Sequence, residues 1–395
     1  MTPVATSFRT SLRITCARSF AELTEHATAW NRLAGEVPFR RWEWCESWWR
    51  HFARPADSLL IPLVWDAEDT LIGAAPFYVQ TSLLSGRTIR LLGDGEVCSD
   101  YLSIIAVPGL ERIVAQRIAR WLCCHVRRDW DLVKLEGVAG DDPGCAWLAE
   151  SMHRLGHLVV QRHLANAWRI ALPRSWPDLV AKMSKPRRRK IKTLESRYFA
   201  AGKAKLHTVD DAGKLACGLE VLHRLHQRRR ESKGDKGCFA SDRFAAFHAD
   251  VARQLLAAGA LRLNWIELDG EPVAVDYGFN GGGVAYAYQS GFDPAAALHN
   301  PGWMQTIASL RQAINAGYEH FDFMRGDEPY KAGWQAQAVP LSEMRIVGGH
   351  LPAHLRHAAW TLLRKPRKLL DWSRQILTAR RHGAPQEPAF VETDA

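Results

Sequence analysis

Residues 318–334 of this chain read YEHFDFMRGDEPYKAGW, and their pattern predicts one buried strand followed by a polar loop. Phe321 and Phe323 alternate with Asp322, so on a strand the two rings face one side and the carboxylate faces the other. Gly326 permits a tight turn directly after the strand. The stretch therefore predicts a strand whose end is followed by several ionisable side chains.

The segments before this strand predict a definite order of elements. Two long helices are expected over 212–230 and 242–258, followed by strands over 261–268, 272–279 and 284–289. Glycine-rich turns separate these three strands. A helix then begins with Asn300 as N-cap and Pro301 in its first turn, and it ends at Gly317.

The first half of the chain contains similar components. Strands are expected over 12–16, 59–66, 70–80, 101–107 and 132–136, with helices over 19–33, 39–52 and 110–126. A second unit begins near Pro173, with helices over 176–183 and 187–200 and a strand over 206–209. This order predicts an N-terminal domain over 1–172, a C-terminal domain over 173–350 and a basic tail over 351–395. No sequence repeat is evident, so the tandem duplication rests on the order of elements.

Composition excludes several classes of protein. Of the 395 residues, 47% are apolar and 24% are charged, which is ordinary for globular domains. No apolar run approaches the roughly 20 residues of a spanning helix, and three arginines within the first 18 residues argue against a secretory signal. The eight cysteines form no C-x-x-C pair, which disfavours a zinc site and a disulfide framework. We expect a cytoplasmic protein with reduced thiols and no metal.

Positive charge is concentrated in two segments. Residues 182–205 hold ten Lys/Arg against one acid, and residues 352–381 hold eight against one, although the whole chain carries only +10. The first segment is expected to be helical and exposed, with its arginines either gripping phosphate at a cleft or simply solvated. The second predicts an amphipathic helix that either contacts a membrane surface peripherally, with Trp360 and Trp372 at the interface, or packs on the protein itself.

Together with the sequence that precedes it, the 318–334 stretch resembles the CelD/BcsL-type acetyltransferases. These form a branch of the tandem-GNAT group of acyltransferases, which also includes the FemABX-like peptidyl transferases. The resemblance spans about residues 35–347. It rests on FDF-x-RGD-x-x-YK at 321–331, LHRLHQRRRESKG at 222–234, DGEPVA at 269–274, YAYQSGFD at 286–293 and NPG at 300–302. The first half matches more loosely, through Phe39, Trp42–Trp49 and Ser99–Leu102.

The resemblance implies an α/β fold with mixed sheets, built from tandem GNAT-like acyltransferase domains. It implies transfer of an acyl group, the acetyl of acetyl-CoA, to an amine or hydroxyl, on a small molecule or a saccharide such as a polysaccharide or envelope precursor. In such sites a backbone N–H at a split strand pair binds the thioester oxygen, and the pyrophosphate lies at a helix start. The donor-binding positions in this chain are then Tyr288, Gln289, Ser290, Asn300 and Gly302.

One departure from the GNAT pattern keeps other functions open. The usual pyrophosphate loop, Q/R-x-x-G-x-G/A, is absent before Pro301. FemABX-like relatives also lack it and use aminoacyl-tRNA as donor, which would suit the basic segment at 182–205. A third alternative is a non-catalytic GNAT-like assembly factor at a membrane surface. The sequence predicts no particular oligomeric state.

The loop at 325–331 is expected to line the deepest cleft of the C-terminal domain. Asp322 or Asp327 would position an amine or orient a base, Tyr330 would protonate the departing thiolate, and Lys331 would neutralise developing negative charge. The alternatives are a capping or ion-paired Asp322, a turn-closing Asp327 and a surface lysine beside a packing tyrosine.

Substrate-binding residues follow from the same motif and from the looser match in the first half. Arg325 would bind phosphate or carboxylate, or pair with a neighbouring aspartate. The match at Ser99–Leu102 adds Asp100 and Tyr101 to the expected substrate-binding set.

Overall fold

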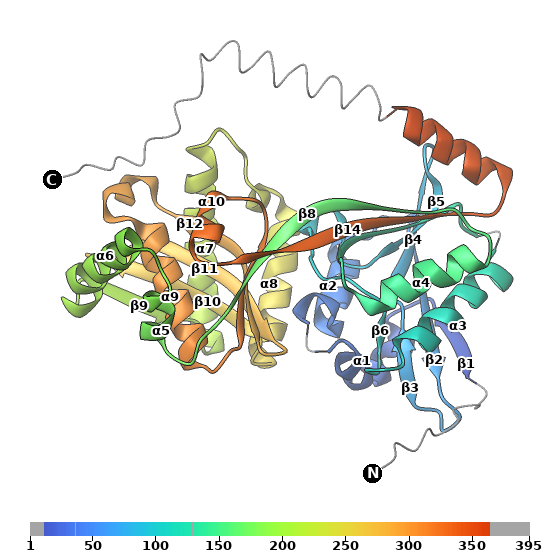
Figure 1. Cartoon of the computed structure of the whole chain (residues 1–395), viewed down its shortest axis with the longest axis horizontal. Coiled ribbons are helices and arrows are strands. Elements are labelled where there is room, and N and C mark those ends of the chain that lie inside the picture. Colours follow the sequence, from blue (N-terminus) through green and yellow to red (C-terminus); the bar gives the residue numbers. More distant parts are fainter. Residues whose placement is uncertain (1–11, 36, 128, 364–395) are drawn as a thin grey trace.

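A computed structural model describes residues 12–35, 37–127 and 129–363 of the chain. Figure 1 shows two α/β units side by side, with two long strands running between them. Their strands join into one mixed sheet of 14 strands, in the order β6-β3-β2-β4-β5-β7-β14-β8-β13-β12-β11-β10-β9 with β1 beside β2. The expected α/β fold with mixed sheets is therefore confirmed.

The second unit has the element order expected from the sequence. It opens with α5 (Trp176–Ala181) and α6 (Lys185–Leu194), which a π-helical turn over Glu195–Ala200 extends. There follow β9 (Ala204–Thr208), α7 (Ala212–Glu231), α8 (Asp242–Ala257), β10 (Leu261–Leu268), β11 (Glu271–Gly281), β12 (Val284–Phe292), α9 (Pro301–Asn315), β13 (His320–Arg325), α10 (Pro329–Gly333) and β14 (Gln337–Val347). Neighbouring strands from β9 to β12 are antiparallel, and β12 pairs with β13 in parallel.

The first unit repeats this order. Its elements are β1 (Arg13–Ala17), α1 (Ala27–Leu33), α2 (Trp42–Phe52), β2 (Ser58–Trp65), β3 (Leu71–Ala74), β4 (Phe77–Ser82), β5 (Gly86–Leu91), β6 (Ile105–Ala106), α3 (Glu111–Cys124), β7 (Leu132–Ala139), α4 (Pro143–Arg154) and β8 (Val159–Ala171). Strands β3 and β4 both pair with β2 and together act as one interrupted strand. Strands β5 and β7 are parallel, as β12 and β13 are. The two units thus share one strand order, which supports the inferred duplication.

The two units exchange their last strands. Strand β8 ends the first unit but pairs with β13 of the second, and β14 ends the second unit but pairs with β7 of the first. The exchanged strands also pair with each other over ten positions. The boundary at residue 172 stays a prediction, and it falls directly after the crossing strand.

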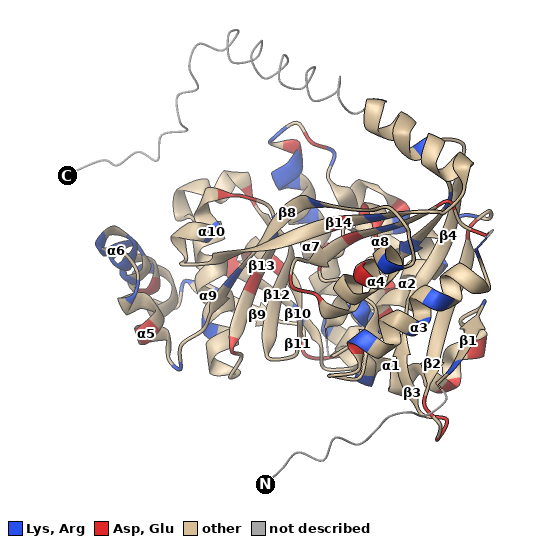
Figure 2. Ribbon diagram, turned by 45° about the vertical axis from the view of Figure 1, so that its right-hand side comes forward, with Lys and Arg blue, Asp and Glu red and all other residues tan. Residues whose placement is uncertain are grey.

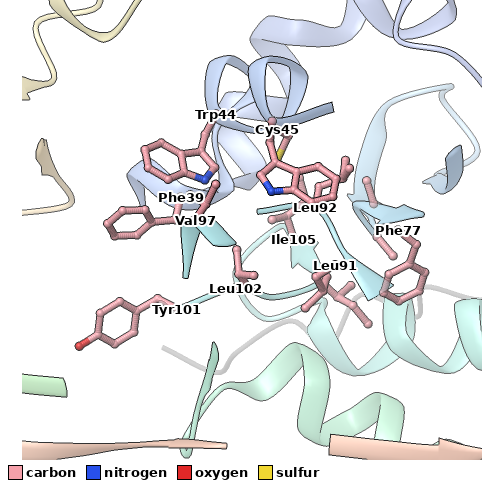
Figure 3. Close-up of a cluster of buried hydrophobic side chains, with 14 of the residues drawn as sticks. Phe39, Trp44, Cys45, Phe77, Leu91, Leu92, Val97, Tyr101, Leu102 and Ile105 are labelled. Carbon is pink, nitrogen blue, oxygen red and sulfur yellow. The ribbon is translucent and has the colours of Figure 1, made fainter. Parts of the chain in front are cut away.

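A hydrophobic core extends through both units. Figure 3 shows part of it in the first unit, where Phe39, Trp44 and Phe77 pack with aliphatic side chains. Helix α2 of the first unit packs on α8 of the second, and Trp44 contacts Phe247 edge-on with ring centroids 5.1 Å apart. The hydroxyl of Tyr101 points away from this cluster in Figure 3. That hydroxyl reaches the second unit, as the next section describes.

Two sequence expectations differ from the structure, and a third falls only partly within the described residues. The strand expected over 101–107 is wrong except at Ile105–Ala106, because Tyr101 adopts a left-handed backbone with φ of 63°. The segment 182–205 is helical only to residue 200, since β9 begins at Ala204. The tail forms a helix over 351–363, as expected, and the remainder of the predicted 351–381 helix lies outside the described residues. None of the described helices is long and apolar enough to cross a membrane.

We expect the two units to unfold together, because each one is completed by a strand of the other. Chemical unfolding of the full chain should give one transition that coincides for tryptophan fluorescence and circular dichroism. Two separated transitions would show that the units are stable without the exchanged strands.

Candidate active site

A cavity of about 600 Å³ lies where strands β12 and β13 separate. The two strands pair only at Val284–Tyr286 with His320–Asp322. Beyond these positions β12 continues along β11, whereas β13 turns toward β8. The lining residues come from α7, β11, β12, β13, α9 and the loop through α10, together with Val97, Cys98 and Asp100 of the first unit.

A left-handed residue turns β13 away from β12. Met324 has a φ of 58°, a backbone conformation that an unbranched side chain adopts only with support. The support comes from Asp322, whose Oδ1 accepts a hydrogen bond of 2.7 Å from the Met324 N–H. An aspartate that bonds its own chain two residues on stabilises such a turn. Asp322 therefore keeps the strands apart and the cavity open.

The opposite edge of the cavity is an irregular strand. The register of β12 on β11 shifts by one residue at Tyr288, because Tyr277 pairs with Gln289 while Gly278 pairs with Ala287. A bulge of this kind bends a strand and re-aims its backbone groups. Only a glycine fits at 278, since a Cβ there would lie 1.9 Å from the Tyr286 carbonyl oxygen. Tyr288, Gln289 and Ser290 all line the cavity, at the edge that β13 leaves unpaired.

Asp322 itself does not line the cavity. It is completely buried, and its Oδ2 accepts hydrogen bonds from the Tyr101 hydroxyl at 2.5 Å and from the Arg169 Nε at 2.8 Å. The Arg169 guanidinium lies over the Tyr101 ring, 4.9 Å from its centroid. The expectation of a catalytic Asp322 at the cleft is therefore wrong in its placement, because all its bonds are to the protein. The ion-paired alternative describes it.

Two of the expected substrate-binding residues, Asp100 and Arg325, bind each other, whereas the third, Tyr101, donates to Asp322. Asp100 is completely buried and accepts from the Arg325 backbone N–H at 3.1 Å and from its Nε at 2.6 Å. Arg325 also donates to the Ser99 carbonyl oxygen at 3.1 Å. Burial raises the pKa of Asp100 to about 6 although Arg325 opposes this, so the carboxyl is ionised at neutral pH. Asp100 and Arg325 line the cavity. Together with the bond from Tyr101 to Asp322, their ion pair joins the first unit to the second.

Lys331 is committed to the loop that carries it. Its side chain is buried, and Nζ donates to the carbonyl oxygens of Met324, Arg325 and Gly326 at 3.1, 3.0 and 2.9 Å. It also forms an ion pair of 2.8 Å with Glu328. Lys331 lines the cavity, and its ammonium group fixes the turn after β13.

Asp327 points away from the cavity. It is exposed and accepts hydrogen bonds from Asn166 Nδ2 and Trp168 Nε1 of β8, both at 3.1 Å. These two bonds hold its pKa below the ordinary value. The expectation that Asp327 lies in the cleft is wrong, because the turn at Gly326 directs it toward β8 instead.

Tyr330 and Glu328 are the ionisable groups of this loop that remain available to a ligand. Tyr330 lines the cavity, half-exposed, with its ring edge-on to Phe323. Burial and the nearby Glu328 raise the pKa of Tyr330 to about 12, with Arg229 opposing. The pKa of Glu328 lies below its ordinary value. Burial alone would raise this pKa, but the hydrogen bond with Lys331 outweighs that effect, so the carboxylate stays ionised. Sequence reasoning missed Glu328, although its place one residue before the Pro-Tyr-Lys string could have suggested it.

A polar floor lies under the cavity, and sequence reasoning missed it too. Asp276 of β11 accepts from Arg262 Nη2 at 2.7 Å and from Ser309 Oγ at 2.8 Å. Gln305 of α9 donates to Ser309 at 3.3 Å, and its Oε1 is buried without a partner among the described residues. All but Arg262 line the cavity. The available signal was an acid inside the apolar strand sequence PVAVDYGF at 272–279.

The start of α9 forms one rim of the cavity. Asn300 adopts a left-handed conformation as N-cap, and Gly302 faces open space. Beside them the ring of Trp303 carries two cations of α6, with Arg187 at 5.3 Å and Lys190 at 4.7 Å from its centroid. Burial lowers the pKa of both cations. Figure 2 shows α6 as a helix with blue along its length.

The guanidinium of Arg187 sits in a space that a glycine leaves free. A Cβ at Gly333 would lie 1.7 Å from Arg187 Nη2. The Nη1 atom of Arg187 is buried and has no hydrogen-bond partner among the described residues. Neither Arg187 nor Lys190 lines the cavity itself, but both lie against the ring of Trp303, which does, and Arg187 has hydrogen-bonding capacity left. The other arginines of the cluster, Arg188 and Arg189, are exposed.

Substitution should separate the structural aspartate from the exposed one. Asp322→Asn leaves Arg169 without its ionised partner in a buried network, so we expect a loss of about 3–5 kcal/mol in the free energy of unfolding. Asp327→Asn, in the loop directly after the same strand but exposed, should cost less than about 1 kcal/mol. Urea unfolding of both variants measures the difference, and equal stabilities would contradict the assigned role of Asp322.

Comparisons with known proteins agree with this geometry. Residues 185–332 match the family model described as an acetyltransferase (GNAT) domain. No curated protein matches the chain in sequence. Among solved structures, FemX is similar with a TM-score of 0.59 at 10% identity, over 81% of this chain and 95% of its own. A conserved protein of unknown function from Bacteroides thetaiotaomicron has a TM-score of 0.51 at 12% identity, over 85% of this chain and 100% of its own.

Within the described residues, no group of three or more His, Cys, Asp and Glu could hold a metal ion.

The cavity between β12 and β13 lies almost entirely inside the matched segment. Residues 185–332 thus match the GNAT acetyltransferase domain model, and the first unit of the chain repeats the strand order of the second.

Proposed function

We propose that this cavity binds an activated acyl donor and that the protein transfers the acyl group to an amine or hydroxyl. The observation that carries the proposal is the separation of β12 from β13 after the Tyr286–Asp322 pair. Backbone N–H groups of β12 beyond this pair border the cavity without a strand partner on that side. Such fixed donors can stabilise the negative charge that develops on a thioester oxygen during attack.

The donor in the first candidate function is acetyl-CoA or a related CoA thioester. Its phosphates would lie at the start of α9, where the Gly302 side is open and the helix dipole favours negative charge. Arg187 and Lys190 would replace the missing glycine-rich pyrophosphate loop as phosphate ligands. The buried Nη1 of Arg187 supplies a free donor for this purpose.

Tyr330 is the proposed acid of the reaction. Its raised pKa keeps the hydroxyl protonated at neutral pH, and it lines the cavity beside the separated strands. It would give its proton to the departing thiolate, while Glu328, ionised in the same loop, would accept a proton from the attacking amine or hydroxyl. Lys331 would hold both groups in place through the turn that it stabilises.

The acceptor would enter from the side of the first unit. Val97, Cys98 and Asp100 form that wall of the cavity. The CelD/BcsL-type resemblance points to a saccharide or envelope precursor as acceptor. The polar groups of this first-unit wall suit a hydroxylated or amine-bearing substrate, since such a substrate makes hydrogen bonds there.

A second candidate function, transfer from aminoacyl-tRNA, is favoured by the floor of the cavity. Asp276 and the unpartnered Oε1 of Gln305 are hydrogen-bond acceptors beneath the place where an acyl group would lie. An acetyl group has no donor to offer them, whereas the ammonium group of an aminoacyl donor would. The cations of α6 would then contact the tRNA backbone.

Donor binding distinguishes these functions. At a hundredfold excess over its dissociation constant, the true donor should stabilise the fold by about 2.7 kcal/mol, which a thermal unfolding titration detects. Acetyl-CoA and aminoacyl-tRNA are tested separately, with deacylated tRNA as control. If neither stabilises the protein, the acyltransferase proposal fails and the non-catalytic alternative gains support.

Two arginines of α6 provide a matched pair of variants for the same titration. We expect Arg187→Ala to weaken donor binding about tenfold or more, because a charge-assisted hydrogen bond contributes about 1.5–3 kcal/mol. Arg189→Ala removes an equal charge from the exposed face of α6 and should change binding little. Equal effects of the two variants would show that only the overall charge of the helix matters.

Tyr330→Phe tests the chemical step. We expect donor binding to remain within about twofold, since the ring is kept, and turnover to fall by about 10²–10⁴-fold if Tyr330 is the acid. Release of free thiol, measured with a panel of simple amines as acceptors, reports turnover. Tyr318→Phe, a tyrosine outside the cavity, is the control, and unchanged turnover in Tyr330→Phe would remove Tyr330 from the mechanism.

A further inference from the structure

Helix α9 buries a polar stripe among the apolar residues that it packs on the sheet. Gln305, Ser309 and Gln312 are four and three residues apart, so their side chains lie along one side of the helix. Gln305 and Ser309 are 6% and 2% exposed, and Ser309 donates to Asp276 of β11, so this side is turned onto the sheet. A helix that covers a sheet ordinarily turns its polar residues outward. The buried stripe therefore indicates a role other than packing.

The sheet under this stripe is polar at the matching place. Asn264 of β10 lies opposite Asp276 of β11 in the antiparallel register, so both side chains are on the face that α9 covers. Asn264 is completely buried, and neither its Oδ1 nor its Nδ2 has a hydrogen-bond partner among the described residues. The same holds for Oε1 of Gln305. Since buried polar groups are almost always paired, these atoms indicate a place for polar groups that the chain itself does not supply.

The polar stripe is continuous with the cavity. Two of its acceptor residues, Asp276 and Gln305, line the cavity, and Asn264 lies directly behind Asp276. The rings of Phe321 and Phe323 of β13 also belong to the lining. A group that enters the cavity therefore meets an apolar surface with a few fixed polar atoms. This is the usual composition of a site that recognises one particular small group.

Arg262 compensates the charge of this floor. Its Nη2 donates to Asp276 Oδ2 at 2.7 Å, and both side chains are buried, so the carboxylate is already paired with a cation. The guanidinium also lies over the Phe321 ring, 4.8 Å from its centroid. Both hydrogen bonds to Asp276 from the described residues are made to Oδ2, so Oδ1 keeps capacity for a ligand, as does Oε1 of Gln305. The floor thus offers fixed acceptors rather than a net charge, and it suits a hydrogen-bond donor that is either a hydroxyl or an amine.

We propose that this floor selects the acyl group of the donor, and that the selected group carries a hydroxyl or an amine on its carbon chain beyond the carbonyl. Asp276 and Gln305 are the selecting residues. The proposal rests on the proposed function, because it takes the edge of β12 as the place of the acyl carbonyl. An unsubstituted acyl group would leave both acceptors buried without a donor. A site built to hydrogen-bond a substrate group rejects the analogue that lacks it far more strongly than an apolar pocket rejects a missing methylene.

Matched CoA thioesters test this selection by isothermal titration calorimetry of the full chain. Butyryl-CoA is compared with 3-hydroxybutyryl-CoA and β-alanyl-CoA, and propionyl-CoA is compared with lactoyl-CoA. We expect at least one hydroxyl or amine thioester to bind about tenfold or more tightly than its unsubstituted counterpart, because it forms a hydrogen bond to a charged acceptor. A preference for β-alanyl-CoA identifies an amine, and a preference for a hydroxyacyl thioester identifies a hydroxyl.

Gln305→Met and Gln312→Met form a matched pair of variants. Gln305→Met keeps the length of the side chain but removes Oε1 from the cavity, so we expect the preference for the polar thioester to fall by about tenfold. Gln312 lies two turns further along α9, bonds Thr208 and does not line the cavity, so Gln312→Met should keep the preference. Thermal unfolding without ligand is the second readout. Gln305→Met should be at least as stable as the wild type, because it removes a buried acceptor without a partner.

Three results would overturn the selection. If the thioesters bind but the members of each matched set bind equally, the floor has no part in acyl recognition, and the acyltransferase proposal still stands. If Gln305→Met keeps the preference of the wild type and is less stable, Gln305 only supports the packing of α9. If none of the thioesters binds, the selection is overturned together with the CoA form of the proposed function.

Discussion

The buried carboxylate of Asp322 is the constraint on which the arrangement of this molecule depends. One oxygen holds the left-handed turn at Met324, which swings β13 away from β12 and opens the cavity. The other joins Tyr101 of the first unit to Arg169 of the crossing strand β8. Opening the cavity and joining the two units are thus the work of one side chain. A charge buried this deeply is tolerated because every bond it needs is made.

The remaining ionisable groups also divide into those whose hydrogen bonds are all made within the protein and those that have bonding capacity left. Arg325 donates hydrogen bonds to a carboxylate, and Lys331 donates to backbone carbonyl oxygens. The charges of both side chains are therefore already compensated by the protein. Tyr330, Glu328 and the amide oxygen of Gln305 face the cavity with capacity left for a ligand. Reactivity in this site therefore lies with the groups at its surface, and the more deeply buried charges supply the rigidity that keeps those groups in position.

The sequence predicted the helices and strands well and the site only in part. Regular hydrophobic periodicity and residues that start or end elements, such as Asn300-Pro301 and the glycine turns, placed the elements of the second unit to within a few residues. Strands β8 and β14 were missed, because a strand that crosses between units is set by partners more than a hundred residues away. The sequence identified the residues of the motif but assigned a part in the reaction to Asp322, Asp327 and Lys331. The structure shows these three side chains bonded to the protein. Asp322 is turned toward Tyr101 and Arg169 while Glu328 lines the cavity, and the left-handed φ of Met324 between them is a feature that no local pattern reveals.

The exchanged strands have a consequence during synthesis. When β7 and β8 leave the ribosome, the strand that will lie between them does not yet exist, since β14 begins only at Gln337. At about 5–20 residues per second the interval is on the order of ten to thirty seconds. Throughout it the nascent first unit presents open strand edges, the surfaces most prone to pairing with other chains. The risk of wrong strand pairing in this fold is therefore greatest before the chain is complete, and it ends when β14 fills the gap between β7 and β8.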